Sequence, residues 1–374
     1  MASLINRFTR AKRVVVKIGS SLLVDSATGQ LRRDWLTALS QDVARMRERG
    51  QDVLIVSSGS IAMGRHVLGL KNTPLRLEES QAAAATGQIQ LAHAYQEILG
   101  LEKIQVAQIL LTPGDTEERR RYLNARSTIT TLLSLGALPV VNENDSVATS
   151  EIRYGDNDRL AARVAQMISA DCLVLLSDVD GLYTADPKGD ADAKFIREVK
   201  DLDSHILAMA SKTKTDVGRG GMETKLKAAQ IAMAAGCNMF ITSGTVMHPL
   251  KALEDGALST CFIAHETPRK ARKKWIAASL SSRGQLAIDK GAEKALKSGK
   301  SLLPAGVTKV NGPFERGDLV TVVNMDGEEL GRGLVAYSSD DAQYIIGHKS
   351  SEIAEILGYS GRDEMIHRDE LALN

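Results

Sequence analysis

The fold is decided by one short stretch, VVVKIGSS at residues 14–21. Its β-branched run is typical of a strand buried in a parallel sheet, and the glycine and serines that follow require the chain to turn. Lys17, near the strand end and beside a turn of small residues, can form a compact anion site. In open α/β sheets, ligands bind outside the carboxyl ends of the strands. The stretch predicts either the phosphate-binding end of a nucleotide-dependent kinase or a core strand with an incidental lysine.

Short β-rich runs alternate with amphipathic segments from about residue 12 to residue 265. Residues 34–49, for example, carry apolar side chains at helical spacing, and Gly50 is placed to end that helix. Strand and helix in alternation predict an open, mostly parallel sheet with helices on both faces. Besides the first strand, the expected strands are residues 53–56, 106–111, 138–141, 173–176 and 239–242, and the expected helices are residues 34–49, 78–99, 123–135, 158–168 and 225–235.

The character of the chain changes near residue 267. Pro268 is followed by a basic run at residues 269–274, and the strands expected beyond Ile276 are short and separated by turn signals. This pattern favours a small β-barrel between Leu280 and about His348. The expected organisation is a catalytic α/β domain at residues 1–266, a linker at 267–279, a β domain at 280–358 and a C-terminal tail at 359–374.

Composition narrows the class of protein. The chain has 374 residues, 43% hydrophobic and 25% charged, and its net charge of +1 gives no global attraction to nucleic acid or membranes. No apolar run approaches the roughly 20 residues that span a bilayer, and residues 1–13 lack the apolar segment of a signal peptide. The cysteines, Cys172, Cys237 and Cys261, are odd in number and widely spaced, which favours buried thiols over a disulfide or zinc set. We therefore expect a cytoplasmic protein.

Polar residues follow two more of the predicted strands. SSGS at residues 57–60 suits a carboxylate or a phosphate, although a tight turn with capping serines gives the same pattern. NEND at residues 142–145 follows a buried strand, and YGDND at residues 154–158 precedes a helix. Asp145 can receive an ammonium group, with Asn157 hydrogen-bonding beside it. The alternative is that residues 156–158 are only a helix N-cap cluster.

Two further motifs suit a nucleotide. SDVDGLY at residues 177–183 offers hydroxyl and carboxylate groups that could bind a nucleoside. The alternative is that these residues only form a turn. GRGGMETK at residues 218–225 is the most specific motif, because its glycines let the backbone approach phosphates and the following helix offers its N-terminal amides. Lys225 adds a point charge there. The loop is not a Walker A loop, since that spacing is absent.

Taken together, these motifs resemble those of the bacterial glutamate 5-kinase family. That family has the amino acid kinase fold and makes γ-glutamyl phosphate from L-glutamate and ATP, the first step of proline biosynthesis. The C-terminal motifs at residues 289–292, 301–307 and 314–318 resemble the PUA domain appended to those kinases. The resemblance keeps the motif order and covers nearly the whole chain. It implies an amino acid kinase fold followed by a small PUA-like β-barrel.

Carried over position by position, the resemblance implies a role for each motif. Lys17 binds ATP phosphates, and Ser177 and Asp178 lie at the nucleotide. Ser177 and Arg219 depart from a common family pattern in which threonine stands at both positions, which leaves the role of the Arg219 side chain open. The implied glutamate-binding residues are Ser58, Gly59, Asp145 and Asn157, and the implied glycine loop consists of Arg219, Gly220, Gly221, Met222, Glu223, Thr224 and Lys225.

The residue types suggest how such a reaction would proceed. A glutamate side-chain carboxylate, with a pKa near 4.3, is already ionised at neutral pH and needs no general base. Its approach to the ATP phosphates is opposed by charge, by about 4 kcal/mol for two unit charges ~4 Å apart at an effective dielectric of 20. Lys17 and Lys225 on either side of the γ-phosphoryl group would offset this repulsion, and Asp158 would orient them. We expect Mg²⁺ to arrive on the phosphates, and we name no protein ligand for it.

Two alternatives remain at this point. One is another amino acid kinase, of the aspartate, acetylglutamate or carbamate type, although the C-terminal β domain argues against it. The other is an RNA-binding PUA protein, against which the near-neutral charge and the aromatic content of 4% argue. The resemblance also implies a homo-oligomer, feedback inhibition by proline, and hand-off of the acyl phosphate to glutamyl phosphate reductase.

Overall fold

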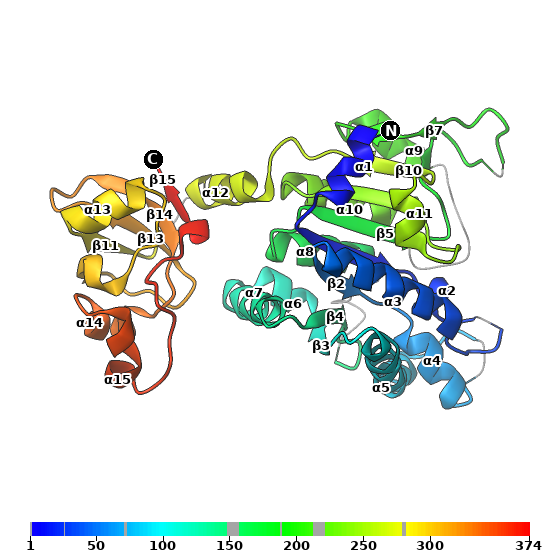
Figure 1. Ribbon diagram of the computed structural model, residues 1–374, viewed down its shortest axis with the longest axis horizontal. Helices are drawn as coiled ribbons and strands as arrows, with labels where there is room; N and C mark the ends of the chain where they lie inside the picture. Colours follow the sequence, from blue (N-terminus) through cyan, green and yellow to red (C-terminus); the bar gives the residue numbers. More distant parts are fainter. Residues whose placement is uncertain are drawn as a thin grey trace. The chain divides into compact units, whose positions relative to one another are not determined.

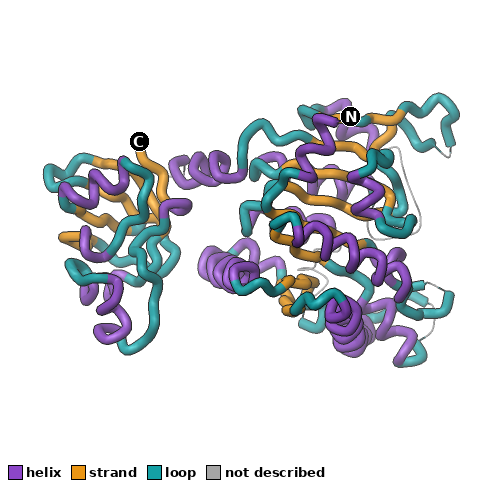
Figure 2. Tube along the Cα trace, viewed as in Figure 1, coloured by secondary structure: helices purple, strands orange, loops and turns teal. Residues whose placement is uncertain are grey.

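The computed structural model describes residues 2–25, 27–70, 73–147, 157–187, 189–211, 221–278 and 282–374. The chain divides into two compact units, residues 1–268 and residues 269–374. Each unit has its own sheet and its own hydrophobic core. Figures 1 and 2 show the helices and strands of both units.

The first unit is built on an eight-stranded sheet with the order β3-β4-β2-β1-β5-β9-β10-β8. Every neighbouring pair is parallel except β9 and β10, so the predicted mostly parallel sheet is confirmed. β6 (Leu182–Tyr183) and β7 (Phe195–Ile196) form a separate antiparallel pair. The strands of the large sheet are β1 (Arg13–Ile18), β2 (Asp52–Val56), β3 (Val106–Leu111), β4 (Leu138–Glu143), β5 (Cys172–Ser177), β8 (Glu198–Val199), β9 (Asn238–Ser243) and β10 (Ser259–Phe262).

Helices cover both faces of this sheet (Figure 1). The five helices expected from apolar spacing are present as α3, α5, α7, α8 and α10, each within a few residues of its predicted range. The helices of this unit are α1 (Ala2–Thr9), α2 (Ser20–Leu23), α3 (Arg33–Glu48), α4 (Ser60–Val67), α5 (Leu77–Leu101), α6 (Pro113–Glu117), α7 (Arg119–Ser134), α8 (Asn157–Met167), α9 (Ser204–Ser211), α10 (Met222–Ala234) and α11 (Pro249–Glu254).

Strand β1 lies in the middle of the sheet and contributes to two cores. Val14, Val16 and Ile18 pack in the core on the α3 side, whereas Val15 packs in the core that contains α8 and α10. Successive side chains of a strand point to opposite faces, so Lys17 shares the face of Val15. The alternation along β1 therefore directs the Lys17 side chain toward α8 and α10.

The second unit contains a five-stranded sheet with the order β12-β11-β13-β14-β15. The prediction of a separate C-terminal β domain is confirmed, while three helices of this unit, α13 to α15, were not predicted. Residues 268–278 form helix α12, and the chain's last strand pairs with β14. The elements are α12 (Pro268–Ala278), β11 (Gly284–Ile288), α13 (Lys290–Lys297), β12 (Val307–Asn311), β13 (Leu319–Val323), β14 (Glu329–Leu334), α14 (Ser339–Ile345), α15 (Ile353–Leu357) and β15 (Leu371–Leu373), with short 3₁₀ turns at Pro304–Gly306, Ser350–Glu352 and Arg368–Glu370.

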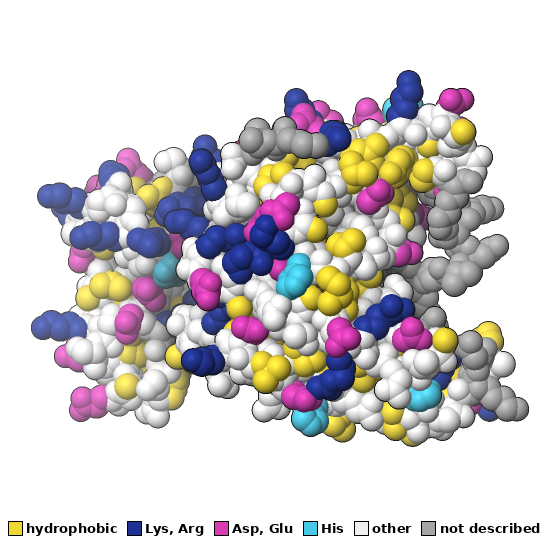
Figure 3. Space-filling view, turned by 45° about the vertical axis from the view of Figure 1, so that its right-hand side comes forward, with side chains coloured by type: hydrophobic (Ala, Val, Ile, Leu, Met, Phe, Trp, Pro, Cys, Tyr) yellow, Lys and Arg dark blue, Asp and Glu magenta, His cyan; other side chains and the backbone are white. Residues whose placement is uncertain are grey.

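Three features of the structure can be compared with what the composition predicts: the surface charges, the cysteines and the apolar character of the helices. Basic and acidic side chains share the face drawn in Figure 3, where Lys and Arg also gather in one dense group. All three cysteines are buried free thiols, as predicted. Within the described ranges, none of the helices combines the length and the apolar character that crossing a membrane requires.

Candidate active site

The centre of the site is one buried carboxylate that binds two lysines. Asp158, in the first turn of α8, is fully buried. Lys17 Nζ lies 2.6 Å from Asp158 Oδ1, and Lys225 Nζ lies 3.1 Å from Asp158 Oδ2. Both lysines are themselves buried, at 7% and 5% exposure. β1, α8 and α10 thus bring together three charged residues that lie in separate sequence motifs and were predicted to act at one site.

Opposing effects act on the Asp158 carboxyl. Burial by itself would raise the pKa of that carboxyl, but the charges and hydrogen bonds of Lys17 and Lys225 outweigh burial and hold the pKa below its ordinary value. The carboxylate is therefore ionised at neutral pH. Two ammonium groups bind the Asp158 carboxylate at once, which places positive charge where an anion can bind.

The N-terminus of α10 adds donors next to this cluster. Gly221 occupies the N-cap in extended conformation, without a side-chain cap hydrogen bond. Thr224 Oγ1 donates to Gly221 O at 2.7 Å and lies 3.5 Å from Asp158 Oδ2. Backbone N–H groups at a helix N-terminus favour anions, and Lys225 lies in the same turn. Arg219 and Gly220 lie outside the described residues.

The side chains of Met222 and Glu223 have other contacts. Met222 is half-buried and packs against the core on the α8 side. Glu223 is 69% exposed and forms an i,i+4 ion pair with Lys227 at 2.6 Å. Residues 222 and 223 therefore contribute backbone N–H groups to the start of α10, while these side chains face the core and the solvent.

The turn after β2 is tied to α8 by Asn157. Asn157 Nδ2 donates to Ser57 O at 2.5 Å and to Ser58 Oγ at 3.0 Å. Gly59 has a φ of +102°, in the region that favours glycine, and forms the N-cap of α4. Asn157 and Ser58, which the resemblance assigns to one ligand, are thus brought together. Gly59 lies next to Ser58 in the same turn.

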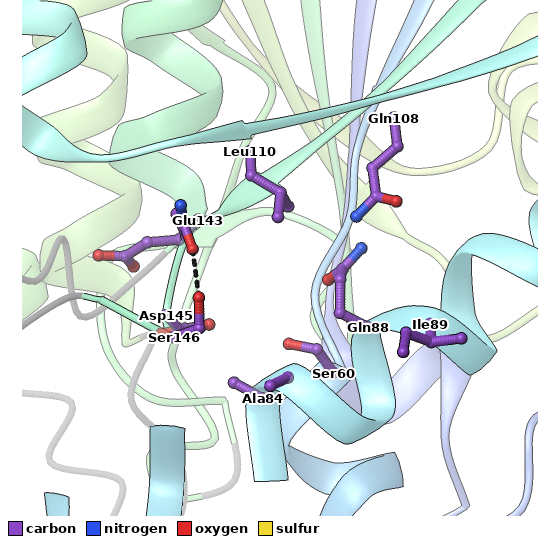
Figure 4. A pocket seen from close by; sticks show the side chains of 11 residues that line it. Ser60, Ala84, Gln88, Ile89, Gln108, Leu110, Glu143, Asp145 and Ser146 are labelled. Carbon is purple, nitrogen blue, oxygen red and sulfur yellow. Dashed lines mark hydrogen bonds between the residues drawn. The ribbon is translucent and has the colours of Figure 1, made fainter. Parts of the chain in front are cut away.

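The end of β4 lines a cavity with a volume of about 190 Å³. Asp145 belongs to its wall, together with Ser60 from the start of α4 and Gln88 from α5. Figure 4 shows Gln88 reaching toward the space that Asp145 and Ser60 border. The other lining residues are Ala84, Ala85, Ile89, Gln108, Leu110, Glu143, Asn144 and Ser146.

The turn after β5 stands next to the lysine cluster, because β5 pairs with β1. Ser177 Oγ donates to Asp178 Oδ1 at 3.0 Å, and Ser177 O accepts from Gly244 N at 2.7 Å. Trp35 Nε1 in turn donates to Gly244 O at 2.7 Å. Hydroxyl and carboxylate groups therefore lie at the carboxyl end of this central strand, held by the loop after β9.

Two residues near the site were given no role by the sequence analysis. Asn142 stands in the quoted NEND motif, and its Oδ1 accepts from Asn157 Nδ2 at 2.9 Å. Gln88 lies in the helix predicted at residues 78–99, and its Oε1 accepts from Asn142 Nδ2 at 2.8 Å. The position of Asn142 after a buried strand was an available signal, whereas nothing in the sequence near Gln88 indicates a distant partner. No three His, Cys, Asp or Glu side chains of the described ranges gather closely enough to hold a metal ion.

The fold and site define the class of the protein. Residues 12–243 match the model of the amino acid kinase family, and residues 284–357 match that of the PUA domain. A solved structure, "Carbamate kinase from Giardia lamblia bound to AMP-PNP", is 19% identical with a TM-score of 0.49, covering 68% of this chain and 99% of its own. The chain is an amino acid kinase with a C-terminal PUA domain.

Curated relatives define the family more narrowly. A glutamate 5-kinase from Paramagnetospirillum magneticum is 62% identical over 97% of this chain and 98% of its own length. A glutamate 5-kinase from Agrobacterium fabrum is 58% identical over 96% of this chain and 92% of its own length. The chain belongs to the glutamate 5-kinase family, which confirms the resemblance and decides against the aspartate, acetylglutamate and carbamate types.

Proposed function

We propose that the chain transfers the γ-phosphoryl group of ATP to the side-chain carboxylate of L-glutamate, giving γ-glutamyl 5-phosphate for proline biosynthesis. Membership of the glutamate 5-kinase family supports the reaction. The observation that carries the mechanism is the pair of lysines on the two oxygens of Asp158. A phosphoryl group transferred to an anion needs cationic stabilisation more than it needs a base, and this cluster supplies it.

In this proposal the two lysines act on the transferring group from different elements. Lys17 extends from β1 and Lys225 from α10, so each can contact a different oxygen of the γ-phosphoryl group. Asp158 holds both ammonium groups at fixed positions before substrates bind, which lowers the cost of reorganisation in the transition state. Its own role is positional, since an ionised carboxylate would repel the phosphates.

We assign the amino-acid part of the substrate glutamate to a site at the carboxyl ends of β2 and β4. Asp145 would bind the α-ammonium group, with Asn157 beside it, and the Ser58–Gly59 turn would donate to the carboxylates. The lining of the cavity by Asp145 and Ser60 supports this assignment. The hydrogen bond of Asn157 to Ser58 supports it as well, because it joins two of these segments.

We assign the nucleotide to the ends of β1, β5 and α10. Ser177 and Asp178 would contact the nucleoside, and the glycine loop from Arg219 to Lys225 would cover the phosphates. The adjacency of β5 to β1 supports this arrangement. Mg²⁺ would arrive bound to the ATP phosphates, where it neutralises charge.

Other aspects of the proposal follow from the family. We propose a homo-oligomer, inhibition by proline, and delivery of the labile product to glutamyl phosphate reductase. We place the reaction in the cytoplasm, where ATP and glutamate are both available.

Turnover of ATP by the purified full-length chain tests the proposal. Glutamate, aspartate, N-acetylglutamate and carbamate are supplied in parallel, and hydroxylamine traps any acyl phosphate as its hydroxamate. We expect hydroxamate formation with glutamate and its suppression by proline. Equal turnover with aspartate, or none with glutamate, would contradict the proposed substrate.

A further inference from the structure

Gln88 connects α5 to the polar end of β4. Its side-chain Oε1 accepts a hydrogen bond from Asn142 Nδ2 at 2.8 Å. Asn142 is 2% exposed, so its amide needs protein partners. Ser60 Oγ, at 3.4 Å, is a more distant acceptor for the same Nδ2. Gln88 therefore supplies the better acceptor for a buried NH₂ group close to the glutamate site.

The orientation of the Asn142 amide is fixed by the backbone. Its Oδ1 accepts from the N–H of Glu143 at 2.9 Å. A backbone N–H can only donate, so the oxygen of the Asn142 amide must face Glu143 and the NH₂ group must face Gln88. The carbonyl of Gln88, and not its NH₂ group, consequently faces Asn142.

The same reasoning fixes the orientation of the Asn157 side-chain amide. Its Nδ2 donates to Asn142 Oδ1 at 2.9 Å and to the carbonyl of Ser57, which can only accept. The NH₂ group of Asn157 is therefore turned toward the protein. None of the described residues donates a hydrogen bond to Asn157 Oδ1, which leaves this oxygen for a ligand. An amide oxygen and the Asp145 carboxylate are both acceptors, which suits the α-ammonium group of an amino acid.

We propose that Gln88 is a positioning residue for glutamate, acting through Asn142 on Asn157. By holding the Asn142 amide, Gln88 sets the direction in which Asn157 Oδ1 meets the substrate ammonium group. The inference rests on the glutamate site proposed above and adds a residue from α5 to it. Gln88 itself does not contact the reacting atoms, so its loss should weaken glutamate binding and leave phosphoryl transfer intact.

Three variants of the full-length chain test this role. Gln88→Met keeps the length of the side chain but removes the acceptor, and should raise the glutamate KM at least tenfold, with kcat and the ATP KM within threefold of wild type. Gln88→Glu keeps an acceptor oxygen and should restore most of the glutamate affinity. Gln90→Met makes the same change at an exposed position of α5 and should leave all three parameters unchanged.

Several outcomes would overturn the role of Gln88. These are an unchanged glutamate KM in Gln88→Met, an equal rise in the ATP KM, or a loss in Gln88→Glu as large as in Gln88→Met. Should Gln88→Met not fold, Gln88→Ala removes the acceptor without filling the cavity and carries the same expectation. Absence of glutamate phosphorylation by the wild type would instead reject the proposed function, so the two failures are distinguishable.

Discussion

Lys17 and Lys225 bind opposite oxygens of one carboxylate, that of Asp158, at 2.6 and 3.1 Å. The lysines come from the first strand of the sheet and from a helix far along the chain, and both are buried. Burying charged groups is costly, and the two ion pairs with Asp158 offset part of that cost while they hold both ammonium groups in place. The arrangement is therefore suited to a phosphoryl group, whose oxygens can interact with both ammonium groups.

Replacement of Lys225 by alanine tests one side of this arrangement. We expect Lys225→Ala to lower kcat by a factor on the order of 10²–10³, with little change in the glutamate KM, because the charge acts mainly in the transition state. Steady-state kinetics with both substrates measures this. Lys227→Ala is a matched control, since Lys227 is exposed on the same helix and pairs only with Glu223 among the described residues. A Lys225→Ala enzyme with normal kcat would refute the role.

Asp145 should contribute to binding more than to catalysis. Removal of a carboxylate that pairs with an ammonium group is worth about 1.5–3 kcal/mol. Asp145→Ala should therefore raise the glutamate KM roughly 10- to 100-fold and leave the ATP KM unchanged. Asp255→Ala, at an exposed aspartate that pairs with Lys251, serves as the control. A fall in ATP affinity would instead show that Asp145 binds ATP and not glutamate, and would contradict the assignment.

Helices α4 and α5 approach each other so closely that a glycine is required at the contact. A Cβ on Gly87 would lie 1.9 Å from Ser60 O, whereas a Cβ on Gly100 of the same helix would meet nothing within 4 Å. Gly87→Ala should force the helices apart and lower the free energy of unfolding by about 1–3 kcal/mol. Gly100→Ala should be neutral or stabilising by up to about 1 kcal/mol. Urea unfolding of the two variants measures the difference in their free energies of unfolding. Equal effects at both positions would contradict the close contact of α4 and α5 at Gly87.

The low pKa of Asp158 predicts how activity and stability depend on pH. The folded-state pKa lies below the ordinary value of 3.8, so the stabilisation from this carboxylate is present above that value and is lost as pH falls through the folded pKa. From pH 5 to 8 the Asp158 carboxylate should stay ionised, and kcat should show no inflection from it. Initial rates over this range measure the profile, with unfolding monitored in parallel. An inflection near pH 6 that Asp158→Asn abolishes would contradict the expected ionisation.

Much of the first unit follows from local patterns in the sequence. Strand β1 is buried on both faces and therefore reads as a continuous β-branched run, and α3 shows its apolar spacing clearly. β10, which runs antiparallel to β9, and the helices α13 to α15 were not predicted, because short elements owe their conformation to packing across the fold. The short C-terminal strand β15 also depends on contacts across the fold, since its three residues are ordered by pairing with β14.

Only part of the candidate site, likewise, could be predicted from local patterns in the sequence. Lys17, Asp158 and Lys225 could be chosen from motifs, because charged residues beside strand ends and glycine loops are unusual. The hydrogen bonds that join Gln88, Asn142 and Asn157 could not be predicted, since they depend on the positions of three separate elements. Amide side chains also carry no charge pattern that would single them out in a helix rich in glutamine.

The most direct test of the central claim is the kcat of Asp158→Asn with glutamate and ATP both saturating. The amide keeps the size of the carboxylate but cannot balance two ammonium groups, so Lys17 and Lys225 should lose their fixed positions. We predict a fall in kcat of at least about 100-fold in a variant that still folds. A kcat close to that of the wild type would show that phosphoryl transfer does not depend on the two lysines being held by this carboxylate.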